Sequence, residues 1–226
     1  MAPVYSSDTT INDISATRGM QDIQKLREII KDETLAPLPY SLNELDKIKS
    51  LADLHGIPCT TFSHTDASKS NFKKFAGSFD ILHLSAHGYV SKEEPQFSGI
   101  FLASDKKDSN GNYNPAWELL HLGELAILET PANLAVLSAC NSASGAIHEG
   151  EGIMSLSRGC LIAGIPNVIA ALWQVNDKNT SDLMISFYSY LFIGNTYSEA
   201  LQKAKKDCIA KGMLPLDWSS FILTGN

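Results

Sequence analysis

The chain has 226 residues, of which 44% are hydrophobic and 19% are charged, and its formal net charge is −7. This composition is typical of a packed globular protein and excludes a disordered one. The acidic balance argues against a general nucleic-acid binder, because the basic residues cluster only at Lys203–Lys206, within a predicted helix. No stretch approaches the roughly 18 apolar residues of a membrane span, and Met1–Tyr5 does not resemble a signal peptide. We therefore expect a cytoplasmic protein that binds neither membranes nor nucleic acid directly.

Hydrophobic periodicity predicts strands that alternate with helices along the whole chain. The first elements are a short strand at 2–6, a helix near 20–31, a helix from Ser41 to about His55, a strand at 57–62, a short helix at 71–76 and a strand at 79–86. Ser41 and Glu44 have the spacing of a capping box for the second of these helices.

The second half continues the pattern after a loop-rich stretch at 90–115. Its elements are a strand at 99–103, a hairpin-type turn at 108–112, a helix at 123–129, a strand at 133–139, a helix at 152–163 that Gly164 ends, a strand at 167–172, helices at 179–191 and 198–211, and a last strand at 218–223. Strands joined through helices predict an α/β fold with a mostly parallel sheet and helices on both faces. We expect one domain over residues 1–226.

Two apolar runs end close to reactive side chains. The run 79–84 leads to His87 and the run 134–137 leads to Cys140, 53 residues later. Parallel sheets place their chemistry beyond the carboxyl ends of the strands, so both side chains are expected at one edge. Histidine as the base and cysteine as the nucleophile form the pair that thiol hydrolysis needs. The backbone amides of Gly88 and Cys140 are our candidates for the oxyanion hole, because glycine allows the substrate to approach closely.

Other chemistries fit the sequence less well. His83 and His87 are four residues apart on a strand, which separates them by roughly 13 Å and prevents them from sharing a metal ion. His83 is therefore expected to be a core histidine bound by a neighbour. Cys59, Cys160 and Cys208 lack zinc-site spacing, and we expect them to be reduced structural thiols. The mechanism needs no metal or cofactor.

A set of motifs in this order resembles the CHAT domain family, which comprises caspase- and separase-like cysteine peptidases. The matching segments are Leu38–Leu45, His83–Gly88, Pro95–Ile100, Leu137–Ser142, Gly150–Gly152, Ser157–Arg158, Ala163–Val168 and Leu172–Asp177, with Trp218 and Phe221 in the closing strand. The resemblance covers about residues 38–224 and implies a caspase-like three-layer sandwich with a His87–Cys140 dyad. Residues 7–37 look like an insertion or N-terminal extension relative to the family.

The resemblance also implies a function and partners. Such peptidases cleave specific proteins, are commonly fused to helical repeats or other sensor modules, and often act in bacterial defence, including antiviral defence, or in regulated cell death. An endopeptidase with a protein substrate and an activating partner is therefore the leading hypothesis. A catalytically silent interaction module with the same fold is the alternative. A receiver- or flavodoxin-like module is a weaker one, because Asp80 lies at the wrong end of its strand.

The loop after Trp173 is expected, by the same resemblance, to line the pocket for the residue before the scissile bond. Relatives of the separase type have an acidic residue after this tryptophan, where this chain has Gln174. We hypothesise that Asp177, helped by Glu149 or Glu151, selects a basic residue. The competing interpretation is that Asp177 caps the helix predicted from Asn179.

Overall fold

The computed structural model describes residues 38–90, 98–103, 118–138, 140–141, 151–173 and 175–225. The predicted elements at 2–6, 20–31 and 108–112 lie outside these ranges. In the described helices, no segment is both long and apolar enough to cross a membrane.

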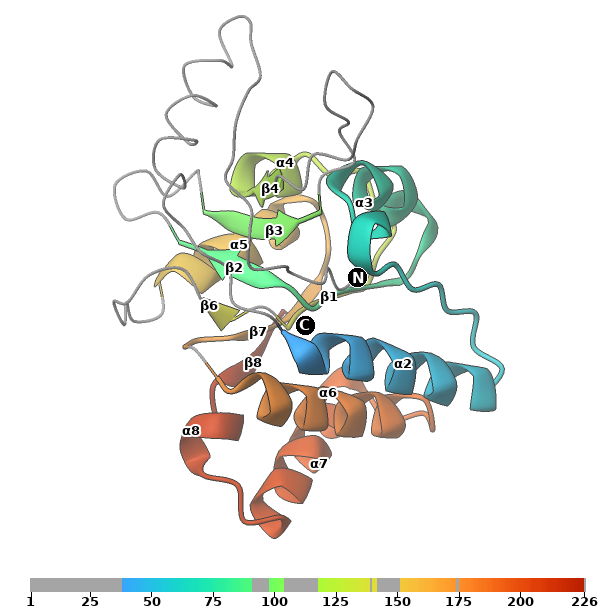
Figure 1. Cartoon of the computed structure of the whole chain (residues 1–226), viewed down its shortest axis with the longest axis vertical. Helices are drawn as coiled ribbons and strands as arrows, with labels where there is room; N and C mark the ends of the chain where they lie inside the picture. Colours follow the sequence, from blue (N-terminus) through green and yellow to red (C-terminus); the bar gives the residue numbers. More distant parts are fainter. Residues whose placement is uncertain are drawn as a thin grey trace, which may run out of the picture.

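A four-stranded, mostly parallel sheet lies at the centre of the fold (Figure 1). Its strands, in spatial order, are β1 (Ile81–Leu84), β5 (Leu134–Leu137), β7 (Asn167–Ala171) and β8 (Phe221–Gly225). The first three run parallel and β8 is antiparallel to β7. The apolar runs thus form the parallel strands that the sequence predicts, and the mixed α/β class is confirmed.

Alternate residues of these strands belong to two separate hydrophobic clusters. Leu134 and Val136 pack in one cluster, whereas Ala135 and Leu137 pack in the other. Because successive side chains of a strand point to opposite sides, the clusters lie on opposite faces of the sheet. Both faces are therefore apolar, which explains why the strand sequences are continuously hydrophobic instead of alternating.

Each cluster is completed by its own group of helices. The cluster that contains Val136 takes side chains from α2 (Pro39–Leu54), α6 (Asp177–Leu191) and α7 (Tyr197–Ala210). The cluster that contains Leu137 takes them from α3 (Lys69–Phe75), α4 (Leu122–Ala126) and α5 (Glu151–Ile162). Short helical turns lie at η1 (His64–Asp66), η2 (Ala76–Ser78) and α8 (Pro215–Trp218).

A second sheet continues from the first. Its strands, in spatial order, are β4 (Glu118–His121), β3 (Gly99–Leu102), β2 (His87–Tyr89) and β6 (Cys140–Asn141). β2 and β6 are parallel, and the other two pairs are antiparallel. The predicted strand 79–86 is thus shorter than expected, since β1 ends at Leu84 and β2 begins at His87 in another sheet.

Some helix boundaries agree with the signals in the sequence, and one predicted start does not. Thr196 and Glu199 form a capping box for α7, and Gly164 follows α5 with a φ of 89°. The capping box predicted at Ser41 and Glu44 is wrong. α2 begins at Pro39, whose fixed φ suits the first helical position, and the Ser41 hydroxyl lies inside the helix and donates to Leu38 O at 2.7 Å.

Two strand predictions also need correction. Residues 57–62 form no strand. Trp218 belongs to the short helix α8 and not to the closing strand, which begins at Phe221. Pro215 at the first helical position favours this turn over the strand that the aromatic residues suggested.

Candidate active site

The strand pair β1–β5 and the strand pair β2–β6 share one register. Leu84 lies opposite Leu137, and His87 lies opposite Cys140, so the partner numbers differ by 53 in both pairs. The two segments of the chain that contain these strands therefore leave the first sheet side by side. They enter the second sheet as neighbours with the same register. This continuity is what positions the candidate base and nucleophile.

His87 and Cys140 are direct partners on adjacent parallel strands. Neighbouring strands lie about 4.8 Å apart. The backbone therefore brings the positions of His87 and Cys140 next to each other on β2 and β6. The His87 side chain is buried, with 1% of its surface exposed.

Gly88, the candidate oxyanion donor, lies within β2 between two other strands. It is opposite Asn141 of β6 on one side and Ile100 of β3 on the other. Its buried position next to His87 puts its backbone beside the candidate nucleophile's strand. Its role as a donor remains a prediction.

The residues predicted for the substrate pocket are only partly described. Gln174 and Glu149 lie outside the described residues, and Glu151 is the first residue of α5. Trp173 is half-buried, and its indole N–H donates to Leu216 O at 2.9 Å. Trp173 is thus held by the short helix α8, which contains Leu216.

Asp177 lies at the first position of α6 and contacts the start of another helix. Its Oδ2 accepts a hydrogen bond from the Tyr40 backbone N–H of α2 at 2.8 Å. Burial raises the pKa of Asp177, and the nearby Glu44 adds to this, although the Tyr40 N–H opposes them. The interpretation that Asp177 caps its own helix is wrong, because Asn176 is the N-cap and accepts from Lys178 N and Asn179 N.

His83 is the core histidine that the sequence predicts. Its Nε2 is 2.6 Å from Glu44 Oε1, and its Nδ1 is 3.1 Å from Tyr188 Oη. Glu44 and Tyr188 are 1% and 2% exposed, so the three side chains connect β1 to α2 and α6 inside the core. Satisfying both ring nitrogens removes the cost of burying the imidazole.

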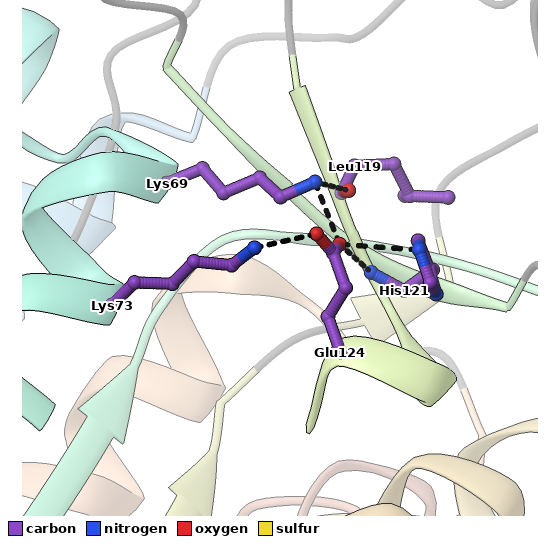
Figure 2. A network of polar contacts seen from close by, with 5 residues as sticks. All are labelled: Lys69, Lys73, Leu119, His121 and Glu124. Carbon is purple, nitrogen blue, oxygen red and sulfur yellow. Dashed lines mark hydrogen bonds and ion pairs between the residues drawn. The ribbon is translucent and has the colours of Figure 1, made fainter. Parts of the chain in front are cut away.

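A second polar network was not predicted from the sequence (Figure 2). Glu124 of α4 accepts from Lys69 Nζ at 2.6 Å and Lys73 Nζ at 2.7 Å, and it caps its own helix by accepting from His121 N at 3.3 Å. Lys69 Nζ also donates to Leu119 O at 3.0 Å. The network fixes α3 to the edge strand β4 of the second sheet. Two local signals were present, namely lysines four apart on one helix and a glutamate three residues after His121.

Burial and neighbouring charges affect the pKa values of Glu124 and His121 differently. Burial would raise the pKa of Glu124, but the hydrogen bonds from Lys69 and Lys73 outweigh it and hold this pKa below its usual value. Burial lowers the pKa of His121, and the attraction of Glu124, which acts in the opposite direction, is too weak to reverse this. The network is therefore an ionised glutamate between two lysines, with a mainly neutral histidine beside it.

The other cysteines occupy structural positions. Cys160 and Cys208 are buried in α5 and α7, as predicted, and burial raises the pKa of Cys160 to about 12. Burial also raises the pKa of Cys208 and of the half-buried Cys59. A thiol whose pKa is raised carries little thiolate at neutral pH, so these three are poor nucleophiles.

The fold and the strand register define a mixed α/β protein with a mostly parallel central sheet. The family model of the CHAT domain matches residues 9–226, and the chain belongs to this family. Among characterised proteins, it is similar to tetratricopeptide repeat protein 28 of Mus musculus, with 32% identity over 110 residues. The protein of the same name in Homo sapiens is 29% identical over 110 residues. Each match covers 48% of this chain and 4% of the relative, so the chain corresponds to a small part of these proteins.

Proposed function

We propose that the protein is a cysteine endopeptidase with a caspase-like three-layer fold, in which Cys140 is the nucleophile and His87 the general base. The observation that carries this proposal is the register of β2 and β6, which puts the two residues opposite each other. Membership of the CHAT family supports it.

In the proposed reaction, His87 takes the proton of the Cys140 thiol, and the sulfur attacks the carbonyl carbon of the scissile peptide bond. A C–S bond forms, and the carbonyl oxygen gains a negative charge, which the backbone amides of Gly88 and Cys140 would stabilise. The C–N bond then breaks as His87 protonates the leaving amine. Water, deprotonated by His87, hydrolyses the thioester and restores the thiol.

The substrate in this proposal is a protein with a basic residue before the cleaved bond, recognised by Asp177. The hydrogen bond from Tyr40 N leaves the second carboxylate oxygen of Asp177 able to accept another donor. The activating partner would carry helical repeats, as the names of the mouse and human relatives suggest. We propose that this cleavage is regulated and takes part in bacterial defence or in cell-death signalling.

The test combines cleavage with the reactivity of the thiol. The full chain is mixed with a proteome-derived peptide library, and new termini are identified by mass spectrometry. We expect cleavage by the wild type that Cys140→Ala and His87→Ala each abolish. Iodoacetamide should label Cys140 roughly tenfold faster than Cys59, and His87→Ala should remove this advantage. Equal labelling rates in the wild type would contradict an activated thiol.

A catalytically silent module is the second candidate, and the burial of His87 is the observation that favours it. A base with 1% of its surface exposed needs a rearrangement before it meets a substrate. Fast labelling of Cys140 together with cleavage would exclude this candidate. Slow labelling with a retained partner complex would support it.

A further inference from the structure

Three helices line a groove of about 460 Å³ at the surface of the protein. α2 contributes four side chains from the range 47–54, and α6 contributes four from the range 182–189. In both helices these side chains occupy positions i, i+3, i+4 and i+7, which lie along one face of a helix. Each stripe is therefore two turns long, or about 10 Å. α7 completes the groove with Asp207 and Lys211.

The stripes on α2 and α6 run side by side in the same direction (Figure 1). At the starts of the two helices, the Tyr40 N–H donates to Asp177 Oδ2 at 2.8 Å. Just past their ends, the ring centroids of His55 and Phe192 are 6.5 Å apart. The two helices thus stay close along their length, and the groove begins more than one turn beyond the contact between Tyr40 and Asp177.

α7 runs in the direction opposite to α6. Lys203 lies over the ring of Tyr190, whereas Asp207, one turn later on α7, accepts from Ser186 Oγ, one turn earlier on α6, at 2.6 Å. Lys211 is one turn further along α7 and therefore lies level with the first part of α6. The lysine that α7 contributes is thus at the end of the groove that is nearer to the helix starts.

The outermost charges of the groove are positive. Lys47 and Lys211 are exposed, and within the described ranges no carboxylate forms an ion pair with either. The two acidic residues of the groove are half-buried and have partners. Asp182 Oδ2 accepts from Lys178 Nζ at 2.8 Å, and Asp207 accepts from two hydroxyls of α6. Lys47 and Lys211 at the rim therefore remain able to pair with carboxylates from outside.

The groove also has apolar side chains and a floor whose hydrogen bonds are already made. Leu54 has 77% of its surface exposed, and Leu51 and Ile185 are half-buried. The hydroxyls of Ser186 and Ser189 both donate to acceptors within the protein. Covering these hydroxyls would therefore leave no donor unpaired, and covering the three apolar side chains would be favourable.

We propose that this groove binds one amphipathic α-helix of a partner protein, with apolar residues along one face and carboxylates at the end that meets Lys47 and Lys211. Two parallel stripes of two turns each leave the shape that a third helix fills. Apolar anchors at helical spacing are the usual way in which a helix binds a groove. The exposed lysines then set the charge of the partner and its position along the groove.

Segments of this chain complement the groove less well. The predicted helix at 20–31 has three basic residues, Lys25, Arg27 and Lys31, against two acidic ones. A second copy carries the same net charge of −7, so two copies repel each other. An acidic helix from another protein is therefore the occupant that the charges favour.

Fluorescence anisotropy with synthetic helices and the full chain tests the proposal. The probes are labelled peptides of about 14 residues, with leucines at positions i, i+3, i+4 and i+7 and with glutamates in either the first or the last turn. Matched peptides carry lysines in place of the glutamates. We expect the better glutamate peptide to bind roughly tenfold more tightly than its lysine counterpart. Equal affinities, or no binding of either glutamate peptide, would overturn the proposal.

A substitution in the apolar part of the groove locates the binding. Leu54→Ser should weaken binding of the glutamate peptide roughly tenfold, because the leucines of the peptide lose an apolar contact. Ile127→Ser is the matched control, since Ile127 follows α4 and is 80% exposed, and it should leave the affinity unchanged. Circular dichroism should show the same fold in both variants. Equal weakening by the two substitutions would contradict binding in this groove.

Reversing the charges of the groove tests its selectivity. Lys47→Glu combined with Lys211→Glu should reverse the preference, so that the lysine peptide binds more tightly than the glutamate peptide. The control combines Lys74→Glu with Lys206→Glu, which are exposed positions outside the groove, and should keep the preference of the wild type. A reversal in both double variants would show a general charge effect and would overturn the proposal.

Other occupants give different results. If a second copy filled the groove, analytical ultracentrifugation would show a dimer of the wild type that Leu54→Ser dissociates. If residues 20–31 filled it, Leu26→Ser in the full chain would free the groove and tighten binding of the glutamate peptide. Either result would overturn the proposal, whereas a monomer and an affinity unchanged by Leu26→Ser would support it.

Discussion

The two sheets of this protein differ in what holds them and in what they carry. The first sheet has a hydrophobic cluster on each face, and its two central strands, β5 and β7, are buried along their length. The second sheet has strands of two to four residues and carries His87 and Cys140 on the shortest two. Its position follows from the first sheet, because β2 and β6 inherit the register of β1 and β5. We propose that the first sheet supplies most of the scaffold and that the second sheet, which adds Ile100, Leu102 and Leu120 to the core, carries the proposed chemistry; mutations can test this division.

The largest loss of stability is expected in the helical cover of the first sheet. Phe187 of α6 is fully buried in the cluster that contains Val136. Phe187→Ala should lower the free energy of unfolding by about 4 kcal/mol, measured by chemical denaturation, because it removes apolar contacts and leaves a cavity. Ile193→Ala, at a side chain with 61% exposure, is the control. An equal effect of both would refute the role of the first sheet as scaffold.

The buried Glu44–His83–Tyr188 network should be the next most sensitive feature. Glu44→Ala leaves the His83 ring buried without its carboxylate partner, and we expect a loss of about 3 kcal/mol. Glu44→Gln keeps an acceptor and should cost less. The measurement is again the free energy of unfolding, with Lys47→Ala on the exposed side of α2 as the control. A larger loss for Glu44→Gln than for Glu44→Ala would argue against this interpretation.

Gly99→Ala should disturb the second sheet itself. An added Cβ would lie 2.6 Å from Leu120 O and 2.7 Å from Leu119 Cγ, so β3 and β4 would have to separate. We expect the free energy of unfolding to fall by about 2 kcal/mol. We also expect the rate at which iodoacetamide labels Cys140 in the folded protein to fall more than it does in Phe187→Ala. Gly77→Ala meets its nearest atom, Glu129 O, at 3.5 Å and should change neither property.

The smallest effect is expected at the outer edge of the second sheet and depends on pH. Glu124 has a lowered pKa, so its ionised form stabilises the folded state above the usual glutamate pKa of about 4.3, and this contribution is lost as pH falls through the folded value. Glu124→Gln should cost about 1 kcal/mol at pH 7. Denaturation at about pH 3 should show a smaller difference between the two proteins. A difference that grows in acid would contradict the ion pairs, and Glu129→Gln on the exposed surface is the control.

The sequence predicts well what depends on local pattern. The apolar runs that became β1, β5 and β7 are long enough to indicate buried parallel strands, and their ends located His87 and Cys140. The capping box of Thr196 and Glu199 is also a local pattern and could have been predicted, although we predicted that helix only from its periodicity.

The errors come from features that local pattern does not determine. A serine followed three residues later by a glutamate occurs at helix starts and inside helices, and at Ser41 the preceding Pro39 sets the start. A strand at 57–62 needs a pairing partner that its own residues do not specify. The network around Glu124 joins residues about 50 positions apart, so no sequence window contains it.

The shared register has a consequence for how this protein tolerates insertions and deletions. In both segments, two residues separate the strand of the first sheet from the candidate catalytic residue. Leu84 is three positions before His87, and Leu137 is three positions before Cys140. Adding one residue to a single connection would turn one side chain to the opposite face of its strand. Adding one residue to each would turn both together. The lengths of the two connections are therefore a matched pair, and a change in one can be compensated only by the same change in the other.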